Sequence, residues 1–312
     1  MIHLSLSKIH LSRRTRTYLS APGSASSRAI SGPYTRWVPG LADEYGLRDR
    51  QARAGIRRDP HASGGLVTWW LSRGEDQLPP AGEWLTAAER GRAEGLRFTK
   101  RRTDYLLGRW TLKLAVARVL GWQDDAAALA RIESRPAPGG APRLYLDGRP
   151  DPRGVSLTDR AGCAVCLVAA GAAAVGCDVE VVEPRSDAFV RDYLTAAERG
   201  LVDAAGPARH RVANLVWSAK ESALKVLGTG LRRDTRSVEV TVAELSPPER
   251  TWSPLQVRTA EGAVLPGWWR RSGPFLVTAC WPGGGPPPTA LEAESPVDTM
   301  APSHRWVDRP VG

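Results

Sequence analysis

Residues 85–91 read Leu-Thr-Ala-Ala-Glu-Arg-Gly, and residues 194–200 repeat the same seven letters. Each copy is followed by a Trp, by a Lys three positions further on, and by a Val-Leu-Gly that ends eleven residues beyond the Trp. Thr-x-x-Glu is a common capping box at helix starts and can recur by chance. Seven consecutive identities followed by the same spacing favour a duplicated α+β unit instead. The landmarks are Trp110, Lys113 and residues 119–121 in the first copy, and Trp217, Lys220 and residues 226–228 in the second.

The pattern around each copy predicts a strand, a short helix, a long helix and returning strands. Thr86 and Thr195 are expected to cap the short helices, and apolar residues at helical spacing predict long helices over 102–120 and 208–227. We therefore expect an α+β fold with two similar α+β halves arranged as an intrachain pseudo-dimer. The expected strands cover 65–73, 131–133, 143–146, 155–157, 161–170, 174–182, 238–242, 255–258 and 276–281.

Composition sets the expected boundaries. Residues 1–60 hold eleven Lys or Arg against four Asp or Glu, so most of the formal net charge of +10 lies in a segment rich in Ser, Gly and Arg. This distribution argues against a nucleic-acid partner. No apolar run approaches the ~20 residues of a membrane span, and no secretory signal is evident, so we expect a cytoplasmic protein. The expected domains are a disordered basic tail over 1–62, a first half over 63–170, a second half over 171–283 and a disordered Pro/Gly-rich tail over 284–312.

Four cysteines do not make a disulfide framework in a chain of this length. Cys163 and Cys166 have the C-x-x-C spacing of zinc and redox sites, but they lie in the apolar run 161–170. A separation of three on a strand places two side chains on opposite faces. We therefore expect two buried thiols that share no metal.

Acidic residues at strand spacing mark the second half. Asp178 and Glu180 lie two apart in an apolar stretch, so both carboxylates should point to one face of a strand. Two adjacent carboxylates are unfavourable unless a cation neutralises them, and a hard divalent ion such as Mg²⁺ prefers such oxygens. The alternative is an exposed sheet face with ordinary surface acids.

A second acid lies on the long helix of the same half. Glu221 and Lys225 form an i, i+4 pair, which by itself can be a solvated surface ion pair. Trp217 and Leu224 share their stripe and should draw the pair toward the interior, where acid and base roles are favoured. Three carboxylates and neighbouring lysines would suit a phosphate ester or pyrophosphate bridged by a metal ion.

The first half lacks these acids and carries a basic run instead. Trp69 and Leu71 occupy the places of the two strand acids, and Leu114 and Arg118 those of Glu221 and Lys225. One half could thus supply cations for phosphates while the other supplies the metal site, although a solvated helix face explains a basic run equally well. The run consists of Arg97, Lys100, Arg101, Arg102, Arg109 and Lys113.

Taken together, these motifs resemble the surfactin-type 4′-phosphopantetheinyl transferases. The resemblance covers about 66–281 and rests on G-x-D-x-E at 176–180 and W-x-x-K-E-S-x-x-K-x-x-G at 217–228. The segment G-R-x-x-x-K at 108–113 is similar to a helix of the family's first half, and Gly140-Ala141-Pro142 is similar to its G-K-P loop.

The resemblance implies a pseudo-dimeric enzyme that transfers the 4′-phosphopantetheine arm of coenzyme A to a serine of an acyl- or peptidyl-carrier protein, releasing adenosine 3′,5′-bisphosphate. Asp178, Glu180 and Glu221 would hold Mg²⁺, with Mn²⁺ as an alternative. Glu221 would accept the serine proton, directly or through water, Lys225 would assist the leaving phosphate, and Lys220 would contact the pyrophosphate. Because a pseudo-dimer contains its whole site, we expect a monomer. The implied CoA contacts are Arg102, Arg109, Arg143, Ser156, Arg160, Asp178, Lys220 and Lys225.

The chain departs from the family pattern at two positions. The family's CoA 3′-phosphate histidine is Asp159 here, and the lysine of G-K-P is Ala141. Arg160 or Arg143 could supply the missing cation, since Arg binds phosphate in a forked geometry. The departures keep open a weakened or inactive relative that binds carrier protein or CoA. Clustered acids in a basic chain also leave a metal-dependent nuclease as an alternative.

Overall fold

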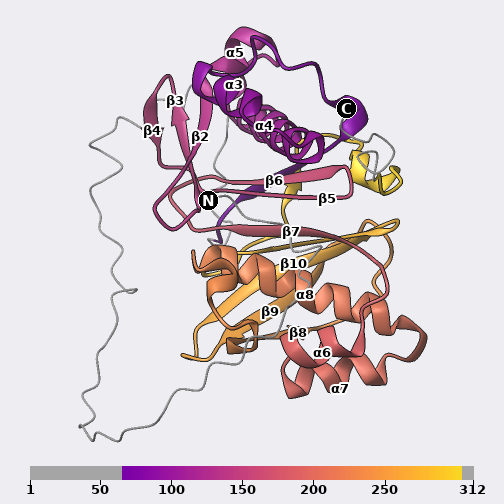
Figure 1. Ribbon diagram of the computed structural model, residues 1–312. Helices are drawn as coiled ribbons and strands as arrows, with labels where there is room; N and C mark the ends of the chain where they lie inside the picture. Colours follow the sequence, from indigo (N-terminus) through magenta and orange to yellow (C-terminus); the bar gives the residue numbers. More distant parts are fainter. Residues whose placement is uncertain (1–64, 304–312) are drawn as a thin grey trace, which may run out of the picture. The chain divides into compact units, whose positions relative to one another are not determined.

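The computed structural model describes residues 65–303, which lie within one compact unit. The expected tail over 1–62 and the last residues of the expected C-terminal tail lie outside the described residues. The described part contains six α-helices and three β-sheets, so the predicted α+β class is confirmed (Figure 1). None of its helices combines the length and apolar composition needed to cross a membrane.

A four-stranded sheet organises the N-terminal part. Its strand order is β12 (Thr289–Ala290), β1 (Thr68–Gly74), β6 (Cys163–Ala169) and β5 (Val155–Arg160). The helix α4 (Thr99–Leu120) packs on one face of this sheet, preceded by α3 (Ala87–Glu94) (Figure 1). Gly121 adopts a left-handed conformation with a φ of 68° and ends α4 where the sequence predicted.

A small antiparallel sheet extends from α4. The short helix α5 (Ala126–Ala130) leads into β2 (Ile132–Pro136), which pairs with β3 (Pro142–Leu146), and β3 pairs with β4 (Arg149–Asp151). The turn between β2 and β3 contains Gly140 and Ala141, and Pro142 of the Gly140-Ala141-Pro142 sequence begins β3.

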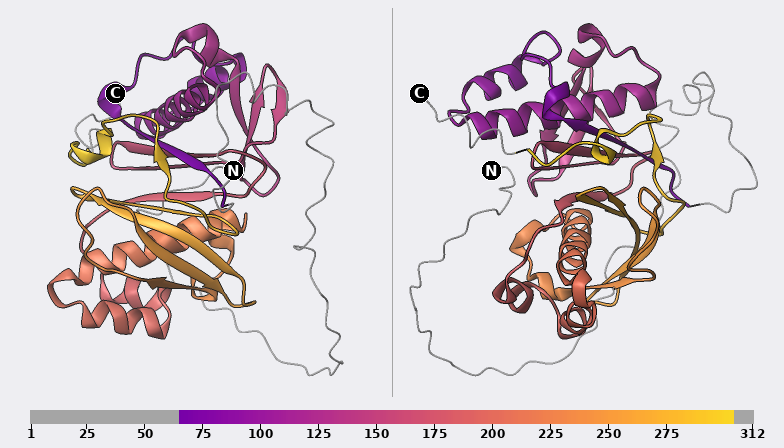
Figure 2. Two further views of the ribbon diagram at one scale, coloured as in Figure 1. Left: turned by 180° about the vertical axis from the view of Figure 1, so that it is seen from behind. Right: turned by 90° about the vertical axis from the view of Figure 1, so that its right-hand side faces the viewer.

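The C-terminal part is a five-stranded antiparallel sheet that packs against α8 (Arg209–Val226). A Cβ atom on Gly176 would collide with the carbonyl oxygen of Ser222, so glycine allows α8 to lie directly on β7. The shorter helices α6 (Asp187–Tyr193) and α7 (Ala196–Ala204) precede α8 (Figure 2). The strand order is β7 (Gly176–Val181), β11 (Phe275–Cys280), β10 (Val264–Ser272), β9 (Ser253–Thr259) and β8 (Val238–Val242).

The two large sheets face each other across a shared apolar layer, and the long helices cover their outer faces (Figures 1 and 2). Cys163 belongs to the layer between the sheets, and Cys166 belongs to the core under α4. Both thiols are free and buried. The prediction that the C-x-x-C cysteines lie on opposite faces is therefore confirmed.

The duplicated letters build the same contact twice. Thr86 and Thr195 cap α3 and α7 as predicted, and each cap is a reciprocal capping box with the Glu three residues later. That Glu forms a buried ion pair with the Lys of the following long helix: Glu89 with Lys113 at 2.8 Å, and Glu198 with Lys220 at 2.8 Å. The repeated sequence thus encodes the joint between a short helix and a long one.

The segment 284–303 adds the edge strand of the N-terminal sheet, and the expectation of a disordered tail over these residues is wrong. Its strand β12 pairs in parallel with β1, and Glu292 forms ion pairs with Arg73 and Arg118. Val297 is fully buried between the two sheets. Backbone pairing, two ion pairs and a buried side chain hold the segment against the core.

Candidate functional site

The site lies where the edge strands β5 and β7 of the two large sheets meet. Asp178 and Glu180 point from β7 toward α8, whereas Val179 and Val181 belong to the apolar layer between the sheets. The predicted alternation of this strand is therefore confirmed. Across the junction, the backbone N–H of Cys177 donates to Ser156 Oγ at 3.0 Å, which fixes β7 against β5.

Asp178 is buried and shares one oxygen between two donors. Its Oδ1 accepts hydrogen bonds from Lys225 Nζ and from Thr158 Oγ1, each at 3.0 Å. Lys225 Nζ also donates to the carbonyl of Cys177 at 2.7 Å. Burial acts to lower the pKa of Lys225, but the charges of Asp178, Cys177 and Glu221 outweigh it and raise that pKa. The other carboxylate oxygen, Asp178 Oδ2, is buried without a hydrogen-bond partner.

Both oxygens of Glu180 are engaged. Trp217 Nε1 donates to Oε1 at 3.0 Å, and Arg185 Nη2 donates to Oε2 at 3.0 Å. Arg160 Nε lies 3.4 Å from the same Oε2. Burial, followed by the charge of Asp178, raises the pKa of Glu180 to about 7, although both arginines act against the rise.

Glu221 projects from α8 into the same environment. It is 8% exposed, and its Oε1 is buried without a hydrogen-bond partner. Burial raises the pKa of Glu221 to about 7, and the charges of Asp178 and Glu180 act in the same direction. The three predicted acids are therefore near enough to oppose one another's ionisation.

The acids fit a divalent cation unequally. Within residues 65–303, no group of three or more His, Cys, Asp or Glu side chains is arranged to hold a metal ion. Asp178 Oδ2 and Glu221 Oε1 are nevertheless unpartnered carboxylate oxygens in a buried, acidic environment, which is the donor type that Mg²⁺ prefers. Glu180 would have to exchange its Arg185 and Trp217 partners to become a further ligand.

Lys220 does not lie at the site, which corrects the expected contact with pyrophosphate. Its side chain is fully buried, and its three donors are used by Glu198 and by the carbonyls of Thr235 and Val238. Lys113 is equally buried, with Glu89 and the carbonyls of Leu129 and Ile132 as partners. The basic run of α4 therefore includes one lysine that cannot reach a ligand.

The other expected CoA contacts divide into two groups. Arg102 and Arg143 are exposed, and the side chain of neither forms a hydrogen bond or ion pair with a described residue. Arg109 Nη1 instead donates to the carbonyl of Ser134 at 2.9 Å, and Arg160 pairs with Glu183 and Glu180. Arg109, Arg160 and the buried Ser156 thus each bind groups of the protein itself.

Asp159 follows Thr158 on β5 and faces charges from several elements. Burial and then the charge of Asp104 raise its pKa to about 7, while Lys100 and Lys225 oppose the rise. The carboxyl that replaces the expected histidine thus belongs to the electrostatic surroundings of Asp178 and Lys225.

Two residues of the site were not found from the sequence. Thr158 was read only as part of a departing motif, and Arg185 lies in a loop without periodicity, five residues beyond Glu180. The sequence signal that could have identified Arg185 is a basic residue that shortly follows a strand with two acidic residues.

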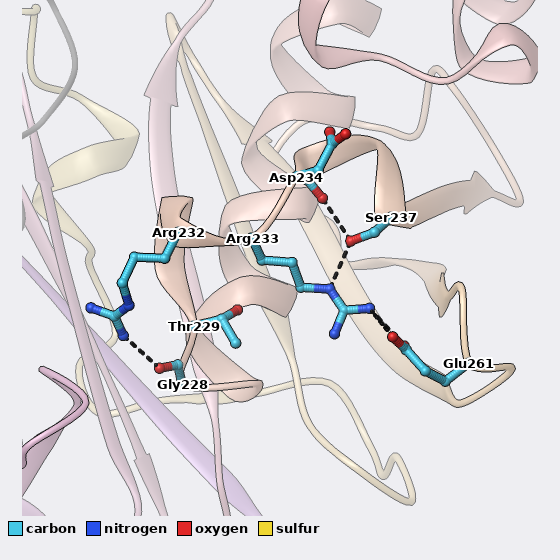
Figure 3. A pocket seen from close by; sticks show the side chains of 7 residues that line it. All are labelled: Gly228, Thr229, Arg232, Arg233, Asp234, Ser237 and Glu261. Atoms are coloured by element: carbon cyan, nitrogen blue, oxygen red, sulfur yellow. Dashed lines mark hydrogen bonds and ion pairs between the residues drawn. The ribbon is translucent and has the colours of Figure 1, made fainter. Parts of the chain in front are cut away.

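An open pocket of about 410 Å³ lies beside the end of α8 and does not include the acids (Figure 3). Arg233 pairs with Glu261 at 2.6 Å. Arg232 turns away and donates to the carbonyls of Gly139 at 3.0 Å and Gly228 at 3.1 Å. The pocket's arginines are therefore already paired, but Arg232 ties the turn between β2 and β3 to the end of α8. The lining residues are Gly228, Thr229, Arg232, Arg233, Asp234, Ser237 and Glu261.

Comparison with known families agrees with this location. Residues 174–269 match the 4′-phosphopantetheinyl transferase superfamily. The matched segment runs from just before β7 into β10 and contains Asp178, Glu180, Glu221 and Lys225. The chain therefore contains a domain of this superfamily. No curated protein matches the chain.

Proposed function

We propose that the protein transfers the 4′-phosphopantetheine arm of coenzyme A to a serine of an apo acyl- or peptidyl-carrier protein. One observation carries the proposal: in the superfamily domain, unpartnered buried oxygens of Asp178 and Glu221 lie in one electrostatic environment with Lys225. This donor set suits a substrate whose reacting centre is a pyrophosphate bound with a divalent cation.

The reaction forms a bond between the serine oxygen and the phosphorus that carries pantetheine. It breaks the bond from that phosphorus to the bridging oxygen, so that adenosine 3′,5′-bisphosphate leaves with the electron pair. Mg²⁺, or Mn²⁺ in its place, would be held by Asp178 and Glu221 and would neutralise pyrophosphate charge. Glu180 would become a further ligand only after it exchanged its present partners. Glu221 accepts the serine proton, directly or through a water molecule. Lys225, oriented by Asp178 Oδ1 and the Cys177 carbonyl, donates to the leaving phosphate.

CoA phosphates need cations that are not already paired. Arg102 on α4 and Arg143 on β3 meet this requirement, and we propose them as CoA contacts. Arg109, Ser156, Arg160 and Lys220 instead act by holding strands and helices in place.

We further propose that the fold is a surfactin-type pseudo-dimer that arose by duplication. The support is the recurrence of one contact in two places: a capping-box Glu paired with a long-helix Lys that also binds two carbonyls. Chance recurrence of a capping box would not reproduce the buried partner and its two carbonyls.

A transfer assay tests the proposed function. The protein is incubated with Mg²⁺, CoA and an apo-carrier protein, and mass spectrometry should reveal a gain of one phosphopantetheine on the carrier. Glu221→Gln should abolish the gain while the circular dichroism spectrum is unchanged, whereas the exposed control Glu244→Gln should transfer normally. No mass gain with several carriers would refute the transferase, and CoA binding without transfer would identify an inactive relative. Cleavage of DNA would support a nuclease.

A further inference from the structure

Glu180 is held more tightly than the other two acids of the site. Trp217 Nε1 binds one of its oxygens, and Arg185 binds the other, with the Arg160 guanidinium alongside. Asp178 and Glu221, in contrast, each keep one buried oxygen without a partner. The cluster thus satisfies one carboxylate completely and leaves two incompletely satisfied.

Arg185 is itself fixed for this contact. Its Nε donates to Asn214 Oδ1 at 2.6 Å, and its guanidinium lies 4.8 Å from the centre of the Phe189 ring. Asn214 is oriented in turn, because its Nδ2 donates to the carbonyls of Glu183 and His210, each at 2.7 Å. A guanidinium held on several sides loses little conformational freedom when it binds a carboxylate.

We propose that Arg185 is a latch that holds Glu180 out of the cation site and thereby limits the affinity of this site for a divalent cation. The inference rests on the proposed function, because it concerns the same acids. Arg185 and a divalent ion compete for the Glu180 carboxylate. The free energy that a cation gains by binding Glu180 is therefore reduced by the cost of breaking the contact between Glu180 and the Arg185 guanidinium.

Binding of Mn²⁺ to the full-length protein without CoA tests the latch by electron paramagnetic resonance. Arg185→Gln should lower the Kd for Mn²⁺ about tenfold, the scale of a hydrogen bond to a charged group. Arg185→Lys, which keeps the charge but loses the fork, should fall between this variant and the wild type. Damage to the fold would weaken binding, so a gain in affinity cannot arise from misfolding. The matched control is Arg191→Gln on α6, whose partner Asp192 is exposed, and its affinity should equal that of the wild type.

A double-variant cycle separates the latch from a general effect of charge. If Arg185 acts through Glu180, Arg185→Gln should not tighten Mn²⁺ binding in a Glu180→Gln background. Equal tightening in that background would overturn the latch, because it would reflect only the loss of a positive charge. If the wild-type protein transfers phosphopantetheine but Arg185→Gln binds Mn²⁺ no more tightly than the wild type, the latch alone would be overturned. Absence of Mn²⁺ binding in every variant, together with no transfer, would overturn both the latch and the proposed function.

Discussion

A lysine ammonium removed from water must find an anion and carbonyl oxygens, and Lys220 finds Glu198 and the carbonyls of Thr235 and Val238. Burial lowers the pKa of Lys220, and the charge and hydrogen bond of Glu198 act against the fall. The residue therefore joins α7, α8 and the start of β8. A motif lysine in this position supports the fold around the site.

Lys220→Met should leave the Glu198 carboxylate buried without its cation. Loss of one partner from a buried ion pair costs about 3–5 kcal/mol, and we expect the free energy of unfolding in urea to fall by that amount. The remaining folded protein should have an unchanged KM for CoA. A Lys220→Met protein of wild-type stability with a raised KM for CoA would restore the interpretation of Lys220 as a pyrophosphate contact.

Asp159 gives the site a dependence on pH. The folded chain keeps a proton on this carboxyl up to about pH 7, whereas an unfolded chain releases it near the ordinary value of 3.8. Stability should therefore fall as pH rises through this window. Burial, followed by the charges of Asp104 and Asp178, raises the pKa of Asp159, while the charges of Lys100 and Lys225 act to lower it.

Asp159→Asn removes this titration. Relative to the wild type, the variant should gain on the order of 1 kcal/mol or more in unfolding free energy between pH 4 and pH 7. Chemical denaturation at several pH values measures the difference. A difference that stays constant with pH would show that the Asp159 carboxyl ionises normally in the folded protein.

Sequence patterns located the acids of the site but not their partners. The alternation of β7 and the helical spacing of α8 place Asp178, Glu180 and Glu221, because periodicity determines which face a side chain occupies. Periodicity does not reveal what covers that face. Lys220 and Lys225 lie five residues apart, which places them about 140° apart around the helix, and one enters the core while the other reaches Asp178. The equivalence of Lys220 with Lys113, in a half without acids, was the signal that Lys220 is structural.

At the level of elements, caps and helix ends were predicted well because they depend on local chemistry. The strand β10 was missed, since Pro266 and Gly267 interrupt its apolar pattern. A Cβ atom at Gly267 would collide with the carbonyl oxygen of Ala279 on β11, so a glycine is required where the strands approach closely. A residue that usually ends a strand is thus part of a central one.

The turn between β2 and β3 is positioned by another element. Arg232, at the end of the 3₁₀ helix Gly230–Arg232 that follows α8, donates to Gly139 and so places the Gly140-Ala141-Pro142 turn beside the C-terminal end of α8. Ala141 lacks the ammonium of the family's lysine, so under the proposed function Ala141 could form hydrogen bonds with the CoA nucleotide only through its backbone.

Arg232→Ala should loosen the turn. We expect the KM for CoA to rise about two- to fivefold, the range of one modest hydrogen bond, with the KM for the carrier protein unchanged. Amides of residues 137–141 should also exchange faster with deuterium. Arg233→Ala is the matched control, because Arg233 pairs with Glu261 in the same pocket but has no bond to the turn (Figure 3). Equal effects of the two variants would show that Arg232 does not act through the turn.

For the whole molecule, the segment 284–303 connects the two large sheets, because it contacts residues of both. Arg118, which occupies the position of Lys225 in the first copy, binds Glu292 of this segment. Asp298 binds Arg270 on β10 of the second sheet, and the Arg270 guanidinium lies 4.8 Å from the ring of Trp70 on β1 of the first sheet. The Gly- and Pro-rich start of the segment 284–303 predicted disorder. That prediction was wrong because composition does not reveal ion pairs with residues about two hundred positions away.

Asp298→Ala should weaken both large sheets at once. Arg270 is only 6% exposed, and burial already lowers its pKa, so loss of Asp298 leaves a buried cation without its carboxylate. The expected cost is about 3 kcal/mol in unfolding free energy, and deuterium exchange should rise in β1 as well as in β10. Glu294→Ala, at an exposed position of the same segment, should change stability by less than about 0.5 kcal/mol. If faster exchange were confined to residues 284–303, the segment would rest on the sheets without joining them. Faster exchange in both β1 and β10 would show that the Asp298–Arg270 pair supports the contact between the two sheets.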